Sequence, residues 1–378
     1  MNRARTICLF LAAAALQGCA GREGKAHVPT GTSEATMAGQ VSREGHKVWI
    51  EGVDRYRVID PLYEGVRIIL AARGDVYSPD YIQGISGSAF RIGGICPCAP
   101  TCANWISPRD FIRLLGYDLE RLKLEGKGDQ LAANTQEVVA RVRKEIDAGR
   151  AVLVWHAFTK AEFDVVFGYD THRKEFLGRG SYAGNDKPYV RADEKRMSTC
   201  GHVCPPLGVI LIGRRTGKLD ARAAEVAALQ EAVRHARWRP DPKKTAGEKW
   251  TMFNGIACYD RWVSDFRKDP KKPPNGSQYC YGVIHTTHRA AGGFLREIAP
   301  KYAKGGEHLK QAAGRFEKEA EILDSGQDVL WWKAPKELTK AHCRKAADLL
   351  QRARDEYVAG IALIEKALTA EGAAIPRD

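Results

Sequence analysis

The pattern of apolar residues changes once along this chain of 378 residues, near residue 216. Short apolar runs come first, at Arg150–Phe158, Glu162–Asp170, Lys174–Tyr182 and Leu207–Arg214. Such runs, bounded by turn residues, are typical of buried strands. Later, apolar residues recur in steps of three and four, as from Leu309 to Leu323 and from Ala346 to Leu368, which predicts amphipathic helices. The chain is therefore expected to be α+β, with a helical bundle at its end.

Helices are also predicted in the first half. Asp60 and Pro61 supply an N-cap carboxylate and a proline suited to a first helical turn, so a helix is predicted from Pro61 to Ala72. Helical patterns also cover Ser107–Leu115 and Thr135–Ala148, and residues 84–87 read as a tight loop. Together with the strands, these helices predict an antiparallel sheet with helices packed on one side.

The N-terminus predicts export and lipid attachment. Arg3 and Arg5 precede a short apolar run that ends in Leu16-Gln17-Gly18-Cys19. The last four residues resemble a bacterial lipobox, which implies cleavage before Cys19 and acyl chains, such as palmitate, on that residue. A plain secretory signal with an incidental cysteine is the alternative. No acidic retention signal follows Cys19, which favours the outer membrane.

Four segments follow from these patterns. Residues 1–18 are predicted to be the signal peptide, 19–44 a flexible tether, 45–215 an α+β domain and 216–378 a helical bundle. The predicted location is the cell envelope, with the protein held on a bacterial membrane by its lipid anchor and facing the periplasm or the surface.

The chain is basic, with a formal net charge of +13. Residues 216–378 hold 29 Lys and Arg against 22 Asp and Glu, and this excess is spread over helical faces. Such a surface could attract anionic lipid, glycan or nucleic acid, or could simply be solvated. The envelope location argues against nucleic acid as a partner.

Eight cysteines remain after the signal and the lipidated residue are set aside. They are Cys96, Cys98, Cys102, Cys200, Cys204, Cys258, Cys280 and Cys343. An even number in an oxidising compartment predicts disulfides. A zinc site with His202 is the alternative for the first five, but their spacings differ from the usual pairs. We therefore expect no metal and no cofactor.

Three stretches, taken in order, resemble a known family. They are "YSPDYIQGISGSAFRI", the pair "AVLVW" and "FDVVFGYD", and "GVILIGR". They are similar to the N-terminal domain of butirosin biosynthesis protein H and, more distantly, to the bacteriocin-leader cysteine peptidases. The resemblance covers about residues 56–215 and implies a papain-like domain.

The residues that such a domain needs for catalysis are missing. Papain-like chemistry uses a thiolate at a helix N-terminus and an imidazole beside it. Alignment by the motifs puts Gly65 at the cysteine position and Glu162 at the histidine position, and leaves Asp170 as a plausible orienting residue. Glu64, Glu162, His156 and Asp170 are therefore the only catalytic candidates.

Other residues have structural explanations. Ser86 nearly matches a nucleophile elbow but reads as a turn residue, because Ser88 stands where the elbow needs glycine. Cys280, His285 and His288 could begin a metal site with Cys258. A Cys258–Cys280 disulfide between neighbouring helices is the favoured alternative.

Three functions remain in view. The first is a membrane-anchored lipoprotein with a degenerate papain-like domain that binds a peptide, a glycan or another envelope protein. The second is an active hydrolase or acyltransferase that uses displaced residues, which requires Glu64, Glu162 and His156 to converge at the start of the helix that follows Pro61. The third is a structural envelope protein, which predicts a large exposed apolar patch on the bundle. The sequence leaves open whether the protein is an enzyme.

Overall fold

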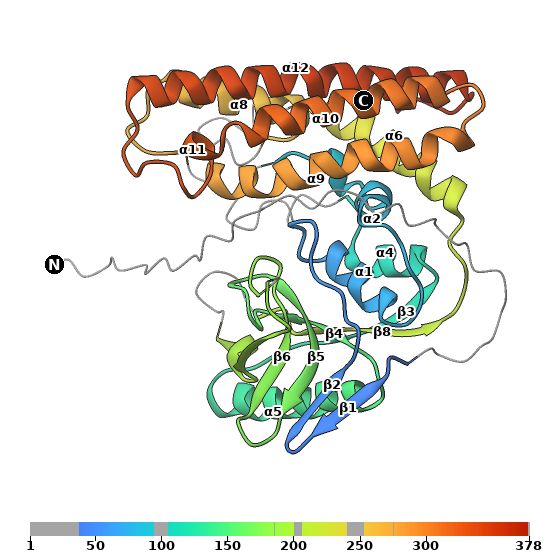
Figure 1. Cartoon of the computed structure of the whole chain (residues 1–378), viewed down its shortest axis with the longest axis vertical. Helices are drawn as coiled ribbons and strands as arrows, with labels where there is room; N and C mark the ends of the chain where they lie inside the picture. Colours follow the sequence, from blue (N-terminus) through green and yellow to red (C-terminus); the bar gives the residue numbers. More distant parts are fainter. Residues whose placement is uncertain are drawn as a thin grey trace.

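The computed structural model describes residues 38–93, 105–184, 186–199, 206–239, 253–274 and 276–376. Within them the fold is α+β, an antiparallel sheet followed by a helical region, which confirms the predicted class. Figure 1 shows the sheet at one end of the molecule and the later helices packed together at the other. The predicted signal peptide and residues 19–37 of the predicted tether lie outside the described residues.

The sheet is antiparallel in every pairing. Its strands are β1 (Val41–Glu44), β2 (Lys47–Ile50), β3 (Tyr117–Leu122), β4 (Val152–Trp155), β5 (Phe163–Asp170), β6 (Glu175–Arg179), β7 (Val190–Asp193) and β8 (Val209–Arg215). The order is β1-β2-β5-β4-β8-β3, and β6 pairs with both β5 and β7. Since β1 begins at Val41, the folded part starts inside the range predicted as tether.

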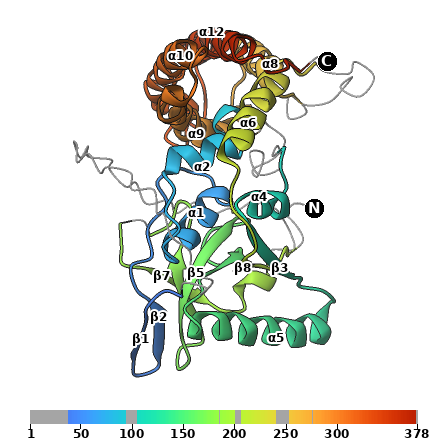
Figure 2. The same ribbon diagram turned by 90° about the vertical axis from the view of Figure 1, so that its right-hand side faces the viewer.

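The two central strands explain the apolar runs in the sequence. β4 and β5 are buried along their whole length. Helix α1 (Tyr63–Ala71) packs on them from the side of the bundle, and α5 (Gly128–Asp147) covers the opposite side (Figure 2). Helices therefore cover both faces of the sheet, whereas the sequence predicted them on one side only.

The helices of the first half differ from their predicted limits. Helix α1 begins at Tyr63, two residues after the predicted Pro61, and its N-cap is Leu62 and not Asp60, although Asp60 Oδ1 accepts the N–H groups of Leu62 and Tyr63, each at 3.1 Å. Helix α4 (Pro108–Leu114) lies where it was expected, and α5 begins seven residues before the predicted Thr135. The loop predicted at residues 84–87 is instead partly helical. Helix α2 (Pro79–Ile85) includes Gly84, and a short 3-10 helix, η1 (Ser88–Phe90), follows it.

The second half is helical, as predicted. Its helices are α6 (Ala221–Ala236), α8 (Gly255–Arg267), α9 (Ser277–Ile298), α10 (Gly306–Asp324), α11 (Gln327–Leu330) and α12 (Lys340–Ala370), with a short 3-10 turn at η4 (Ala299–Lys301); another, η2 (Arg196–Ser198), lies in the α+β half. The apolar stripes of α10 and α12 face each other in the bundle core. None of the helices in the described ranges is both long and apolar enough to cross a membrane.

The bundle packs directly onto the α+β half. Helix α9 lies against α2, where Gly84 leaves room for the ring of Phe294: a Cβ on Gly84 would lie 2.0 Å from Cγ of that ring. Gly293 is equally close to the Asp80 side chain. One continuous apolar core runs through both halves. The two predicted domains therefore share a tightly packed interface.

Candidate functional site

The helix position expected to carry a nucleophile is closed by packing. Gly65 lies in the first turn of α1 and is buried. A Cβ at this position would lie 2.6 Å from Cδ2 of Leu153 and 3.0 Å from the hydroxyl oxygen of Tyr56. Any side chain here would require the buried side chain of Leu153 to move. A thiol at Gly65 would therefore enter the core and not an open cleft.

The bundle covers the start of α1. Tyr279 of α9 donates its hydroxyl to the carboxylate of Glu162, which precedes β5. Thr286, also on α9, accepts the N–H of Ile59 at 3.2 Å. The start of α1 is thus covered by a helix of the same chain.

Beneath this cover lies a cluster of buried acids. We call Asp60, Glu162 and Asp164, with the tyrosines Tyr56 and Tyr279 between them, the carboxyl cluster. Burial raises the pKa of Tyr56 well above its ordinary value, and the charges of the three acids and of the nearby Glu64 raise it further. The pKa of Tyr279 is also raised well above its ordinary value, first by burial and then by the charge of Glu162. Several acids in one dry space are a feature of functional sites.

Asp164 lies in β5 and is fully buried. Its Oδ2 accepts the N–H groups of Phe158 and Thr159 at 2.6 and 2.7 Å, while its buried Oδ1 has no hydrogen-bond partner. Burial raises the pKa of Asp164 to about 7, although the two N–H groups oppose the shift. The group is therefore close to half protonated at neutral pH.

The loop between β4 and β5 holds this arrangement in a strained backbone. His156 and Ala161 have φ angles of 59° and 56°, in the left-handed region that non-glycine residues rarely adopt. The two are joined because the His156 Nδ1 accepts the Ala161 N–H at 2.9 Å. Strain of this kind concentrates at functional sites and costs about 1–3 kcal/mol per residue.

Asp164 should make the stability of the protein depend on pH. The unfolded chain loses this proton near the ordinary pKa of 3.8, whereas the folded chain keeps it until about pH 7. Between these values the folded state binds more protons, so this contribution to stability falls as the pH rises from about 4 to about 7. Asp164→Asn should remove the slope and raise the free energy of unfolding at pH 8 by roughly 2–4 kcal/mol.

Urea titrations of the two proteins across this pH range measure the difference. Asp193→Asn is the matched control, because Asp193 is exposed at the end of β7. It should leave the pH profile unchanged. If the profile of Asp164→Asn also runs parallel to that of the wild type, the raised pKa of Asp164 is wrong.

Glu64, the first predicted catalytic residue, does not join the cluster through a hydrogen bond. Its Oε1 accepts the N–H of Arg57 at 3.1 Å and the guanidinium of Arg67 at 2.8 Å, and its Oε2 has no partner. Glu64, Glu162 and His156 are all buried near the start of α1 or the end of β4. However, Glu64 is bound to Arg67 and does not contact the other two through its carboxylate.

Asp170 and Ser86 have local roles. Asp170 ends β5, roughly 25 Å along the strand from Glu162, and accepts the N–H groups of His172 and Arg173. It therefore lies too far away to orient a base at the carboxyl cluster. Ser86 donates to the Gln83 carbonyl at 3.1 Å, which confirms it as a turn residue.

The three described cysteines are free thiols. Cys96, Cys98, Cys102, Cys200 and Cys204, together with His202, lie outside the described residues. Cys258 and Cys280 are neighbours, and burial followed by the hydrogen bond with Cys280 raises the pKa of Cys258. The structure does not bridge them, and the Cys280 thiol donates to the Gly93 carbonyl at 3.3 Å; the disulfide between them stays a prediction. Cys343 contacts the Pro270 carbonyl instead.

The Cys280 thiol is one of several groups that hold a segment of the α+β half inside the bundle. We call residues 90–93 the buried segment. Tyr357 donates to the Phe90 carbonyl at 2.9 Å, a His288 nitrogen lies 3.0 Å from the Arg91 carbonyl, and the Gly255 N–H binds the Ile92 carbonyl at 2.9 Å. The Ile92 N–H lies 3.0 Å from the His235 Nε2. Backbone and side-chain groups of α6, α8, α9 and α12 thus satisfy the polar backbone of this segment.

The histidines of α9 serve packing and hydrogen bonding. His288 contacts Glu319 at 2.8 Å, whereas His285 contacts the carbonyl of Tyr281 and stacks on its ring. The metal site considered for Cys280, His285 and His288 is therefore not assembled. In the described ranges no group of three or more His, Cys, Asp or Glu could hold a metal ion.

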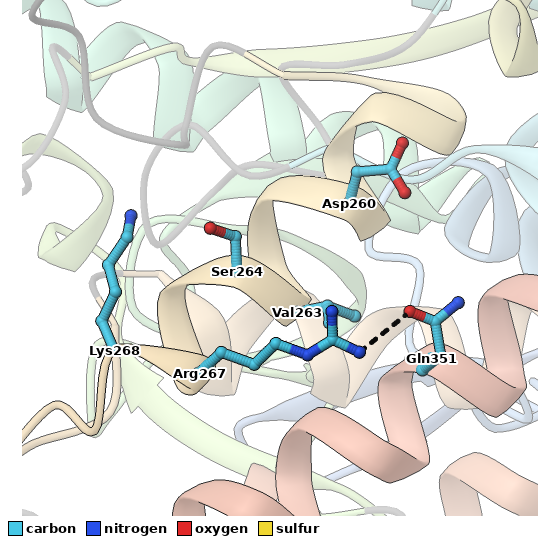
Figure 3. A pocket seen from close by; sticks show the side chains of 6 residues that line it. All are labelled: Asp260, Val263, Ser264, Arg267, Lys268 and Gln351. Carbon is cyan, nitrogen blue, oxygen red and sulfur yellow. Dashed lines mark hydrogen bonds between the residues drawn. The ribbon is translucent and has the colours of Figure 1, made fainter.

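A pocket of about 250 Å³ opens between α8 and α12 (Figure 3). It is lined by Asp260, Val263, Ser264, Arg267, Lys268 and Gln351. It lies in the bundle and shares no residue with the carboxyl cluster.

The sequence signal for the carboxyl cluster was partly visible. Asp164 interrupts an otherwise apolar strand, and burying a carboxylate in such a strand lowers the stability of the fold unless the group is hydrogen-bonded or has a function. Asp60 was interpreted only as a helix cap, and Tyr279 has no signal, because it is 117 residues from its partner Glu162.

A comparison of the sequence with models of known protein families and with curated proteins gives no match. The papain-like relationship stays a hypothesis based on the three sequence motifs.

Proposed function

We propose that this protein is a lipid-anchored envelope protein whose papain-like half has no peptidase activity and binds a partner as a scaffold together with the bundle. The observation that carries the proposal is the closed position at Gly65, where a Cβ would already lie 2.6 Å from Leu153. The cover of α9 adds support, since Tyr279 reaches Glu162 over the start of α1. The partner, a peptide, a glycan or another envelope protein, is then bound on the outer surface and not at the start of α1, which α9 covers.

The anchor is supported by the sequence around Cys19. Residues 20–40 separate that cysteine from β1, and a chain of this length spans at most about 70 Å. The folded part would then stay near the membrane surface, where a partner in the same envelope can be reached.

The experiment has two parts. Detergent phase partitioning of wild type and Cys19→Ala tests the anchor: the wild type should enter the detergent phase and the variant the aqueous phase. Electrophilic probes for serine, cysteine and carboxylate nucleophiles test catalysis, and the native protein should remain unlabelled. A probe that labels one residue, with labelling lost on a single substitution, ends the proposal that catalysis is absent.

Acid–base catalysis at the carboxyl cluster is the second candidate. The pKa of Asp164, raised by burial to about 7, favours it, because general acids and bases work best with a pKa near the working pH. An epoxide probe that labels Glu162 or Asp164 in the wild type but not in Asp164→Asn would establish it.

The purely structural alternative has less support. It predicts a large apolar patch on the bundle. In the described part of the chain the exposed large apolar side chains are Val76, Tyr182 and Trp332, and only Trp332 belongs to the helical half.

A further inference from the structure

One end of the bundle gathers basic side chains that lack acidic partners. Six exposed residues share this property: Arg267, Lys271, Lys272, Lys333, Lys336 and Lys340. Across the described ranges, many other lysines and arginines of the bundle form ion pairs, as Lys345 does with Asp328, whereas these six, like a few scattered residues such as Lys304 and Lys366, form none. Their charges are therefore available to an external anion.

The six residues come from two loops that lie side by side. One loop joins α8 to α9, the other joins α11 to α12, and the Leu338 N–H donates to the Lys271 carbonyl at 2.9 Å between them. Both loops are at the end of the bundle where α12 begins (Figure 1). Residues 264–274 and 331–340 hold seven Lys and Arg and three Asp and Glu, a net charge of +4. We call these two stretches the basic end.

An aromatic side chain protrudes from the basic end. Trp332 is 44% exposed, while its neighbour Trp331 packs against the rings of Tyr281 and His285. The inner tryptophan fixes the loop and the outer one points into solvent. Tryptophan beside lysine is the combination that proteins place at the interface between a membrane and water.

The pocket between α8 and α12 adjoins this surface. Two of its charges are already neutralised, because Asp260 accepts from Arg354 at 2.5 Å and Lys268 lies 3.0 Å from Asp265. Arg267 contacts only the amide oxygen of Gln351, at 3.4 Å. Its guanidinium points toward Gln351 and forms no ion pair among the described residues, so its charge is available to an anion in the pocket (Figure 3).

We propose that the basic end is a docking surface for an anionic membrane, with Arg267 binding a lipid phosphate in the pocket, Trp332 entering the interface and the five lysines lying over the headgroups. The inference deepens the proposed function, on which it rests for the nearby membrane. Charge complementarity selects the occupant: a net charge of +4 with an exposed tryptophan suits a phosphate-rich, partly apolar surface. Docking would orient the protein on the membrane to which Cys19 tethers it.

Cosedimentation with vesicles tests the surface without the anchor. The chain is produced from Ala20, which keeps every described residue, and is mixed with vesicles of phosphatidylcholine alone or with added phosphatidylglycerol. We expect binding to the anionic vesicles that weakens as salt is raised. Each lysine near such a surface contributes roughly a fivefold gain in affinity, so replacing Lys271, Lys272, Lys333 and Lys336 by Glu should weaken binding at least about a hundredfold. Trp332→Ser should weaken it without changing the salt dependence.

The matched control makes the same change of charge on the α+β half, at the exposed Lys127, Lys144, Lys174 and Lys187. It should bind within about threefold of the wild type, since charges beyond about 10 Å are screened at 0.1 M salt. Thermal unfolding checks that both variants fold. The inference would be overturned if the two variants lost vesicle affinity equally, or if the wild type bound neutral vesicles as well as anionic ones. It would also be overturned if the wild type bound no vesicles but was retained on nucleic acid. A wild-type protein that partitions into detergent but fails the vesicle test would leave the anchor intact and remove only the docking surface.

Discussion

Replacing Glu319 by alanine should lower the free energy of unfolding by about 3–5 kcal/mol. Glu319 is fully buried in the bundle, where one carboxylate oxygen accepts the hydroxyl of Tyr259 at 2.5 Å and lies 2.8 Å from the His288 ring. Its removal leaves both partners buried without an acceptor. The effect should reach the buried segment as well, because the other nitrogen of His288 contacts the Arg91 carbonyl.

Urea denaturation measures this loss, and pH separates its parts. Burial lowers the pKa of His288, but Glu319 and the Arg91 carbonyl outweigh burial and leave the pKa raised. The stabilising charge pair is therefore complete below about pH 6.5 and is lost as the pH rises through the raised pKa of His288. Glu321→Ala is the control on the same helix. Glu321 is exposed, and its carboxylate forms a weak surface ion pair with Lys318 at 3.6 Å. A loss of less than 1 kcal/mol for Glu319→Ala would contradict the account of the bundle core.

Replacing Phe294 by alanine should also cost about 3–5 kcal/mol, and the loss should be felt in both halves of the protein. The ring is fully buried between α9 and the α+β half, 5.9 Å from the ring of Tyr81 and 6.0 Å from that of Phe90. A cavity there interrupts the one core that both halves share. We expect a single cooperative transition at lower denaturant, seen equally by fluorescence and by far-ultraviolet circular dichroism.

A size exchange provides the control for Phe294. Gly84→Ala alone places a Cβ against the ring and should cost about 1–3 kcal/mol. Combined with Phe294→Leu, it should cost less than the sum of the two changes, because residues in contact couple by about 0.5–3 kcal/mol. Strict additivity would mean that α2 and α9 do not pack as described.

The broad architecture follows from the sequence because apolar periodicity reports burial directly. β4 is a continuous apolar run, and β5 is one apart from Asp164 and its last residue, since helices cover both faces of the sheet. Helix α12 carries a long apolar stripe because it packs along α10. The hairpin of β1 and β2 was missed. Its first strand is short and half exposed, and Gly45, with φ of 56°, makes the turn, so the stretch resembles a tether.

The candidate site was harder to predict because its contacts are distant in the sequence. The absence of a thiol at Gly65 was visible, but the reason it cannot return, the side chains of Leu153 and Tyr56, was not. The position of Cys258 beside Cys280 could be anticipated from the sequence, and whether the pair is oxidised stays a prediction. The buried segment had no signal, since its partners come from four helices of the second half.

The reactivity of a thiol introduced by Gly65→Cys tests the central claim most directly. Native protein is treated with iodoacetamide, and peptide mass mapping follows the introduced thiol alone, with unfolded protein as the reference for full labelling. The account predicts that the thiol reacts only when the protein unfolds, and that the variant is less stable by about 1–3 kcal/mol because its Cβ meets Leu153 and Tyr56. Rapid labelling in the folded state, as expected of an activated thiolate at an open helix N-terminus, would contradict it.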